Sequence, residues 1–470
     1  MQKLQQYSSA RSAAPEVDRN SLIEHIRQQL NSQQLGLASS EGFTPVPVSL
    51  TPWQLTPAQF NHAKQLAALL GQIQAQATQQ LEWLLRLTKG LAKSQTVPGQ
   101  IWRALHGLYD KRSLKSADKC QAQHSNLMLN RHDFLLDNQQ QWRWVESNPI
   151  AAGMGPLNSS YLALLRQNQP GPYANNDAIT SQAEFLAQGA TAMAKLQSED
   201  SLSPLMLIVV DAHEDNIFDQ QLLCNAVIRQ GVRVERVTVK QLLQCFINDK
   251  NQLLWQESRV DLLYWRTGYN PSAELNDQFW HFRAQLEQAA VAQSPTLAGQ
   301  LTGSKWFQHQ FTALLLDDPS AIATQFGLTS AEISTLTQTV VPSFALSGLT
   351  LDRAQQLIAE GYWYKTQQEG GGNVARGQAA KDKLANADSA DLLMAPIDAA
   401  LRREAFTSLR QGETTVSTEH ISELGIFSLG DEAHYGGYLC RTKPAQNNEG
   451  GVHRGGAVLD TIRFPQLTGP

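Results

Sequence analysis

The segment Leu205-Met206-Leu207-Ile208-Val209-Val210 is an uninterrupted apolar run near the middle of the chain. Such a short run predicts a strand that is buried on both faces. Apolar residues then recur at helical spacing over 216–229, a strand is predicted over 232–239, a helix over 242–247 and a third strand over 262–265. This alternation is typical of a small doubly wound α/β unit with a parallel sheet, which binds ligands beyond the carboxyl ends of its strands.

The flanking sequence follows other patterns. The residues from 21 to about 91 predict core-facing helices, because apolar residues recur there at helical spacing. The last third is rich in predicted strands and in glycine pairs. Further helices are predicted over 104–110, 276–293, 305–315 and 378–385, and further strands over 126–128, 142–146, 362–365, 392–397, 420–429 and 438–442.

Composition limits the possible functions. The chain has 470 residues, which suggests about two to four domains. Its 38 Lys and Arg against 43 Asp and Glu give a net charge of −5, so we expect no nucleic-acid partner. Apolar runs are too short to span a membrane, and the first thirty residues show no secretory signal, so we expect a cytoplasmic protein. The four cysteines form no C-x-x-C pair and are expected to be free thiols.

The nonapeptide Lys365-Thr366-Gln367-Gln368-Glu369-Gly370-Gly371-Gly372-Asn373 places a lysine on a predicted strand, followed by an acid and three glycines. Glycine amides can approach phosphate oxygens, Lys365 adds a point charge, and Glu369 adds a hard oxygen ligand for magnesium. A flexible loop between two strands is the alternative, because glycine is common in turns. The segment matches neither the P-loop nor the dinucleotide-binding motif.

Two further groups of residues suggest metal and anion binding. Glu146 and Asn148 end a predicted strand and, two residues apart, point to the same face, where both can hold one metal ion. Glu423 on one strand, Arg441 and Lys443 on the next, and a glycine-rich loop beyond them can line a pocket for a nucleotide and a carboxylate. For each single charge, the alternative is a solvated surface.

Together these segments resemble the eukaryotic-type glutathione synthetase family of ATP-grasp ligases, in the family's order from about residue 130 to 460. The matching segments are 130–133, 146–148, 214–220, 265–269, 301–305, 365–373, 421–427 and 439–459. The resemblance implies an α/β fold of ATP-grasp type with a helical N-terminal region, an inserted doubly wound parallel α/β substrate unit and a β-rich C-terminal nucleotide-binding region with glycine-rich lid loops. The implied domains are residues 1–200, 201–304 and 305–470.

The family joins γ-glutamylcysteine to glycine at the expense of ATP, through an acyl phosphate, and releases glutathione, ADP and phosphate. The resemblance implies Mg²⁺ as cofactor, small-molecule substrates and a homodimer. Implied catalytic residues are Arg131, Arg441 and Lys365, and implied magnesium ligands are Glu146, Asn148 and Glu369. Implied ATP-binding residues are Lys305, Lys365, Gly370, Gly371, Gly372, Asn373, Met394, Ile397, Glu423, Lys443 and Glu449. Implied substrate-binding residues are Arg131, Ala151, Gly153, Glu214, Asn216, Gln220, Arg266, Tyr269, Arg441, Val452 and His453.

The chain departs from the family's pattern mainly around the dipeptide. Ala151 and Gly153 stand where the family has serines, so exchanging both for serine is expected to lower the Michaelis constant for the dipeptide. His453 and Arg454 stand where the family has alanines. Further departures are Val374, Arg376, Ala395, Pro396 and Glu449. A related ligase with another dipeptide or acceptor, and a catalytically silent nucleotide-binding protein, are the competing hypotheses.

Overall fold

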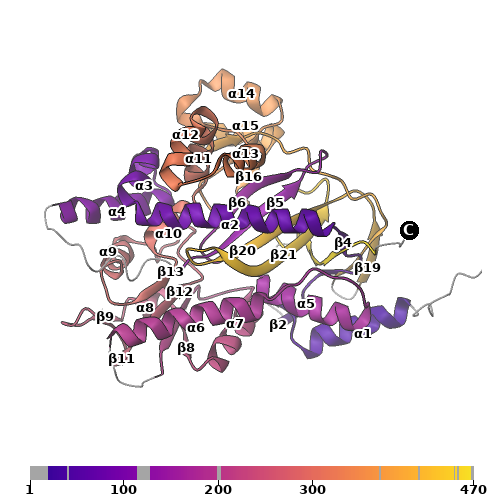
Figure 1. The fold of residues 1–470 in the computed structure, drawn as a ribbon, viewed down its shortest axis with the longest axis horizontal. Coiled ribbons are helices and arrows are strands. Elements are labelled where there is room, and N and C mark those ends of the chain that lie inside the picture. The colour runs from indigo at the N-terminus through magenta and orange to yellow at the C-terminus, as the bar shows by residue number, and fades with distance from the viewer. Residues whose placement is uncertain are drawn as a thin grey trace, which may run out of the picture.

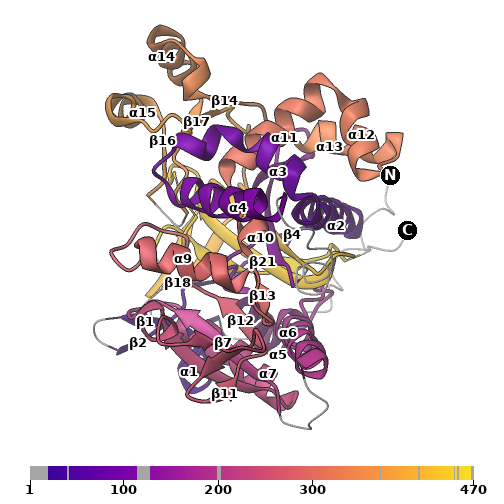
Figure 2. The same ribbon diagram turned by 90° about the vertical axis from the view of Figure 1, so that its left-hand side faces the viewer.

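A computed structural model describes residues 19–39, 42–113, 127–197, 203–369, 372–410, 413–448, 450–452 and 455–466. The described elements form three tiers (Figures 1 and 2). A parallel sheet with its helices lies at the bottom of both views, a large eight-stranded sheet lies in the middle, and a small sheet with two helices projects at the top. The chain therefore has a mixed α/β fold.

The parallel sheet has the strand order β13-β12-β7-β8, and all three of its pairings are parallel. Its strands are β7 (Leu205–Val210), β8 (Arg233–Thr238), β12 (Leu262–Trp265) and β13 (Ala292–Ser294). Alternate residues of β7 enter two different hydrophobic cores. The helices on one face are α5 (Gly155–Asn168), α6 (Ala178–Gln197) and α7 (Ile217–Arg229), and those on the other are α9 (Asp277–Leu286) and α10 (Leu297–Thr302). The predicted doubly wound unit is confirmed.

The eight-stranded sheet has the order β19-β18-β3-β22-β21-β20-β5-β6 and takes strands from both ends of the chain. All of its pairings are antiparallel except that between β22 and β3. Its strands are β3 (Val48–Ser49), β5 (Leu129–Leu136), β6 (Trp142–Asn148), β18 (Phe406–Arg410), β19 (Glu413–Ser417), β20 (His420–Leu429), β21 (His434–Pro444) and β22 (Val458–Asp460).

The top tier is a four-stranded sheet with the order β14-β17-β15-β16. Tyr364 points into its own small core, so Trp363 and Lys365, its neighbours on β15, point to the opposite face. The elements of this tier are β14 (Ser343–Ala345), α14 (Leu351–Ala359), β15 (Trp363–Lys365), β16 (Val374–Ala375), α15 (Gly377–Lys383) and β17 (Leu392–Met394), with 3₁₀ turns Leu346–Gly348 and Leu384–Asn386.

The N-terminal helices confirm the predicted helical pattern. Helix α2 (Pro57–Gln79) begins at a capping box between Thr56 and Gln59, and it crosses the large sheet in front of β20 (Figure 1). The remaining helices are α1 (Arg19–Ser32), α3 (Leu81–Leu87), α4 (Val97–Ser113), α8 (Val239–Leu242), α11 (Lys305–Asp317), α12 (Pro319–Phe326) and α13 (Ser330–Thr339), with a 3₁₀ turn at Lys89–Lys93. The remaining strands are β1 (Gly36–Ser39), β2 (Gly42–Pro45), β4 (Trp53–Gln54), β9 (Phe246–Ile247), β10 (Leu253–Trp255), β11 (Ser258–Arg259) and β23 (Ile462–Arg463).

Three predicted elements are misplaced. The strand expected at 126–128 begins at Leu129, where pairing with β20 starts, and Asn126 lies outside the described residues. The helix expected over 242–247 is wrong, because the capping box at Thr238 starts a short helix earlier and β9 then pairs with β10. The helix expected over 276–293 ends at Leu286, since Gln293 belongs to β13 beside β12.

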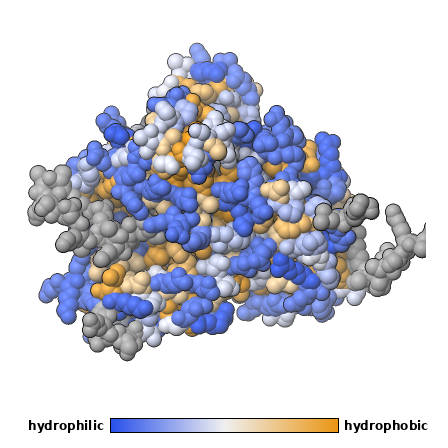
Figure 3. All heavy atoms as spheres, viewed as in Figure 1, coloured by the Kyte–Doolittle hydropathy of each residue, from blue (hydrophilic) through white to orange (hydrophobic). Residues whose placement is uncertain are grey.

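Hydrophilic side chains predominate on the face drawn in Figure 3, with apolar side chains exposed between them. Within the described ranges, no helix has the length and apolar character that a membrane crossing requires. Cys224, Cys245 and Cys440 are buried free thiols, as expected, and Cys120 lies outside the described residues.

Candidate active site

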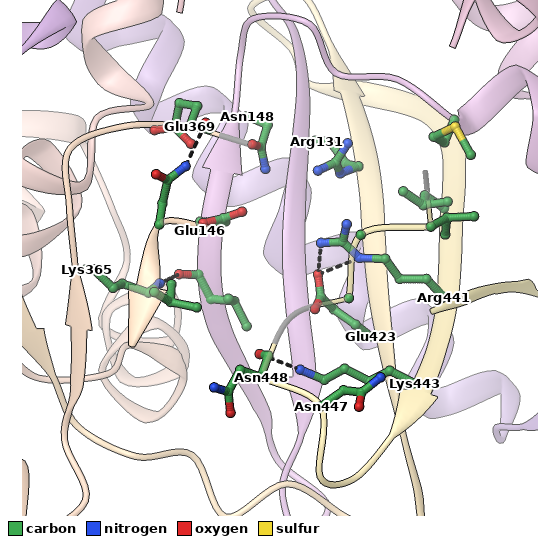
Figure 4. A pocket seen from close by; sticks show the side chains of 18 of the residues that line it. Arg131, Glu146, Asn148, Lys365, Glu369, Glu423, Arg441, Lys443, Asn447 and Asn448 are labelled. Atoms are coloured by element: carbon green, nitrogen blue, oxygen red, sulfur yellow. Dashed lines mark hydrogen bonds and ion pairs between the residues drawn. The ribbon is translucent and has the colours of Figure 1, made fainter. Parts of the chain in front are cut away.

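A cavity of about 1450 Å³ opens where the three sheets face one another. Its walls carry side chains from β5, β6, β20 and β21 of the large sheet, from the carboxyl ends of β7 and β12, and from β15 and β17 of the small sheet. The large sheet, the glycine-rich segment and the loop after β21 contribute the side chains labelled in Figure 4: Arg131, Glu146, Asn148, Lys365, Glu369, Glu423, Arg441, Lys443, Asn447 and Asn448.

Strand alternation brings the charged residues of the large sheet to one face. Arg131 pairs in register with Asn148, and Asp133 with Glu146. On the neighbouring strands, Glu423 pairs with Arg441. Because side chains two residues apart on a strand share a face, these residues lie on one face of the sheet, and the pairing of β20 with β5 places Glu423 and Arg441 near Arg131 and Asp133.

Ion pairs join the arginines of this face to its acids. Arg131 donates to both carboxylate oxygens of Asp133, at 2.7 and 2.8 Å. Arg441 forms an ion pair with Glu423 and donates to Asp133 at 3.4 Å. The amide nitrogen of Asn148 also donates to Asp133, at 3.1 Å. Burial raises the pKa of Asp133, although both arginines oppose that effect. This network fixes two guanidinium groups at the cavity wall.

Two buried lysines face the cavity from the opposite side. Lys305, the first residue of α11, lies 3.0 Å from the carboxylate of Glu369 and donates to the carbonyl oxygen of Gln368 at 2.8 Å. Lys365 donates to the carbonyl oxygen of Val145 on β6 at 3.2 Å. Burial lowers the pKa of Lys365, against the effect of Glu146. Lys305 therefore holds the segment that leads into the glycine triplet, and Lys365 links the small sheet to β6.

The two carboxylates beside these lysines differ in their acidity. Burial acts to raise the pKa of Glu146, but Lys305, Lys365 and the arginines outweigh it, and the pKa falls to about 2. Burial raises the pKa of Glu369 to about 7, against the effect of Lys305. The described residues hold no group of three His, Cys, Asp or Glu side chains with metal-ligand geometry.

The carboxyl ends of β7 and β12 form a second region of the cavity wall. Arg266 is buried. Hydrogen bonding around Asn216 favours the orientation in which its amide oxygen faces Arg266, and Nη2 of Arg266 then donates to that oxygen at 2.9 Å. The Nε of Arg266 has no hydrogen-bond partner among the described residues. Glu214 faces the cavity, and Gln220 lies behind it and donates to its carboxylate. Arg266 therefore places a fixed positive charge at this part of the cavity wall.

The loop after β6 passes directly beside Arg266. A Cβ atom added to Gly153 would lie 2.5 Å from Nη2 of Arg266, so the guanidinium occupies the space of the missing side chain. Ala151 has a φ of 52°, in the left-handed region that few residues other than glycine adopt. Asp219 accepts hydrogen bonds from the amides of Met154 and Leu157 at 2.8 and 3.0 Å and fixes the turn into α5.

The structure gathers most of the predicted site residues around this one cavity. Those that line it are Arg131, Glu146, Asn148, Ala151, Gly153, Glu214, Asn216, Arg266, Tyr269, Lys305, Lys365, Glu369, Asn373, Met394, Ile397, Glu423, Arg441, Lys443 and Val452. Gln220 lies behind the wall, and Gly372 does not line the cavity. Five further residues of interest lie outside the described residues: Gly370, Gly371, Glu449, His453 and Arg454.

Sequence reasoning gave no role to Asp133 or Trp363. Asp133 follows Arg131 at a spacing of two, which is the signal that both share a face. Trp363 precedes Lys365 at the same spacing and lines the cavity, with the guanidinium of Arg376 lying 5.1 Å from its ring centre.

The chain also matches known proteins. Residues 15–464 match the family model described as "Eukaryotic glutathione synthase, ATP binding domain". The glutathione synthetase of Rattus norvegicus is 30% identical over 365 residues, 71% of this chain and 74% of the relative. The chloroplastic glutathione synthetase of Solanum lycopersicum is 25% identical over 465 residues, 92% of this chain and 80% of the relative.

A solved structure shares the fold. The apo form of a glutathione synthetase-like effector from Globodera pallida superposes with a TM-score of 0.67 at 15% identity, over 96% of this chain and 98% of that one. At this identity the likeness concerns the fold alone, whereas the family match covers nearly the whole chain. The chain therefore belongs to the eukaryotic glutathione synthetase family of ATP-dependent ligases.

Proposed function

We propose that this chain is a glutathione synthase that uses ATP to join γ-glutamylcysteine to glycine. The observation that supports this most directly is that one cavity holds lysines, arginines, two acids and an amide together. Its volume of about 1450 Å³ exceeds the usual range for one small ligand, so a nucleotide and a peptide have room side by side.

The lysine side of the cavity suits the nucleotide. Lys305 and Lys365 would neutralise phosphate oxygens, while Trp363, Met394 and Ile397 would contact the base and ribose. Asn373, Glu423 and Lys443 line the same space. The roles of Gly370, Gly371, Gly372 and Glu449 in phosphate binding, and the lid formed by the glycine loop, stay predictions.

Glu146, Asn148 and Glu369 fit a magnesium ion by their chemistry. Mg²⁺ prefers oxygen ligands and usually combines one or two carboxylates with substrate phosphates. Asn148 donates its amide nitrogen to Asp133, which leaves its oxygen for a cation. When bound, Mg²⁺ would neutralise charge that develops on the transferring phosphoryl group.

The arginine side suits the acyl donor. A carboxylate oxygen of the donor would attack the γ-phosphorus of ATP, and ADP would leave. The amine of the acceptor would then attack the acyl carbon, lose a proton and release phosphate. Arg131 and Arg441 would hold the reacting carboxylate in line, and Arg266 would bind an anionic group elsewhere on the donor. The chain itself supplies no nucleophile in this route.

The remaining predictions concern organisation. An ATP-grasp architecture agrees with the facing sheets around the cavity, and the three-domain division at residues 200 and 304 stays a prediction. A homodimer and a cytoplasmic location are expected from the family resemblance and the sequence, respectively. Equilibrium sedimentation of the purified chain tests the dimer.

A ligase for another dipeptide or acceptor is the second candidate, and the contact of Gly153 with Arg266 favours it, because that contact occupies space beside the donor. ADP release from ATP and magnesium, measured across γ-glutamyl dipeptides and amino-acid acceptors, separates the two. We expect the highest kcat/KM with γ-glutamylcysteine and glycine. A higher value for another pair would establish the second candidate, and no ADP release with any pair would support a silent nucleotide-binding protein.

A further inference from the structure

Asp133 lies at the centre of the cavity wall formed by the large sheet. Its side chain is 1% exposed, yet the acid lies in the middle of a strand, where a buried charge is costly unless it is fully paired. Its burial therefore depends on the partners that surround the carboxylate.

The carboxylate of Asp133 accepts hydrogen bonds from three residues. Its Oδ1 accepts from Nε of Arg131 at 2.7 Å. Its Oδ2 accepts from Nη2 of Arg131 at 2.8 Å, from Nδ2 of Asn148 at 3.1 Å and from Nη2 of Arg441 at 3.4 Å. One acid thus contacts both arginines assigned to the reacting carboxylate and the amide assigned to the cation.

These contacts decide how each partner faces the cavity. A bidentate contact fixes the plane of the Arg131 guanidinium, so the directions in which its remaining N–H groups can donate are fixed as well. A carboxylate only accepts hydrogen bonds, so Asn148 must present its nitrogen to Asp133 and its oxygen elsewhere. Without this acid, the two positive charges would repel each other and the amide would be free to turn over.

Gly425 provides the space in which the pair lies. It stands opposite Asp133 in the register of β20 and β5, and a Cβ atom there would lie 2.5 Å from Oδ1 of Asp133 and 2.7 Å from Cδ of Arg131. Any side chain at this position would displace the ion pair. The ion pair between Asp133 and Arg131 therefore depends on the absence of a side chain at Gly425.

We infer that Asp133 is the positioning residue of the active site: it orients Arg131, Arg441 and Asn148, and Gly425 leaves room for it. The inference rests on the proposed ligase function, since it assigns these partners to the reacting groups. Asp133 itself need not contact substrate.

The test compares Asp133→Asn and Gly425→Ala with the full-length wild-type protein. Asp133→Asn keeps the shape of the side chain but replaces one acceptor oxygen by an NH2 group. Because this group cannot accept a hydrogen bond, the arginines lose their common acceptor. We expect kcat to fall roughly 100-fold in both variants, with the KM for ATP within about threefold of wild type. We also expect the magnesium concentration for half-maximal activity to rise in Asp133→Asn, because Asn148 is released. In Asp133→Ala, added formate should restore part of kcat by supplying the missing carboxylate.

Matched controls separate positioning from stability. Asp460 is also buried and pairs with Arg402 at 2.6 Å, away from the cavity, so Asp460→Asn should lower Tm while leaving kcat near wild type. Gly436→Ala is the control for Gly425→Ala, because the three atoms nearest to its Cβ would all belong to the side chain of Leu429. Asp133→Asn with near-wild-type kcat would overturn the inference. Control variants that lose kcat as much as Asp133→Asn for the same fall in Tm would overturn it too, because the loss would then reflect stability.

A structural measurement keeps the inference separate from the proposed function. Wild-type protein that releases no ADP with any donor and acceptor counts against the function alone. In that case, a crystal structure of Asp133→Asn decides the inference. Displaced guanidinium groups of Arg131 and Arg441 support it, and unchanged positions overturn it.

Discussion

The guanidinium of Arg266 lies over Gly153 so closely that a Cβ atom on the glycine would be 2.5 Å from Nη2. This contact alters the expectation that serines at positions 151 and 153 improve dipeptide binding. A new side chain at 153 must displace a buried arginine, whereas the expectation from sequence considered only the hydrogen bond that a serine would add.

We therefore predict that Gly153→Ser raises the KM for γ-glutamylcysteine roughly tenfold, because displacement of Arg266 forfeits a charged hydrogen bond worth about 1.5 kcal/mol or more. Steady-state kinetics with varied dipeptide measure this. In the matched variant Ala151→Ser, serine must adopt the same left-handed backbone as alanine. This variant should leave the KM for γ-glutamylcysteine equal or lower. A fall in KM for Gly153→Ser would restore the original expectation.

Glu146→Gln and Glu369→Gln should each abolish ligation and leave the fold intact. Loss of a hard-cation ligand removes several kcal/mol of transition-state stabilisation. ADP release at ordinary magnesium concentrations measures the effect, and circular dichroism checks the fold. Glu413→Gln, on the exposed strand β19, is the control. Near-normal turnover of both site variants would contradict the metal assignment.

The products should be ADP and phosphate, because the lysines and the acids surround a site for phosphoryl transfer to a carboxylate. When the acceptor is omitted, hydroxylamine should trap the acyl phosphate as a hydroxamate. Product analysis by chromatography measures both results. Recovery of AMP and pyrophosphate would establish adenylylation instead.

Trp363→Ala should raise the KM for ATP roughly tenfold with little change in kcat, since stacking of a base on an aromatic ring is worth about 1–3 kcal/mol. Trp363→Phe should have a smaller effect. Phe344→Ala removes an exposed ring from the same sheet, outside the cavity, and serves as control. An unchanged KM in Trp363→Ala would place the base elsewhere.

His132 should make the protein less stable in mild acid. Its ring nitrogens contact the hydroxyls of Ser147 and Ser428 at 2.7 and 2.9 Å, and burial lowers its pKa to about 3. The unfolded chain binds a proton at this side chain below about pH 6.5, but the folded chain does not. Stability is therefore complete above pH 6.5 and falls as the pH drops toward 3, by on the order of 2 kcal/mol at pH 5.

The Tm of wild type and of His132→Asn, measured from pH 7.5 to 5, tests this prediction. The difference between the two proteins removes the contribution of other titrating groups. We expect the wild-type Tm to fall more steeply with decreasing pH. Parallel curves would show that His132 does not cause the loss.

The sequence alone determined the parallel α/β unit and the family. The run Leu205–Val210 is apolar at every position, and such a short run favours a strand covered on both faces. Hydrophobic cores indeed lie on both sides of it. The order of short motifs from residue 130 onward identified the family, because the order of motifs along the chain is a property of the sequence alone.

Only the tertiary structure decided which residues meet. Asp133 pairs with Gly425 and contacts Arg441, about three hundred residues away, because β5, β20 and β21 are neighbours in one sheet. Strand order depends on long-range pairing, which local periodicity does not encode. For the same reason, the sequence shows at Gly153 only a missing hydrogen-bond donor, whereas the structure places the guanidinium of Arg266 beside it.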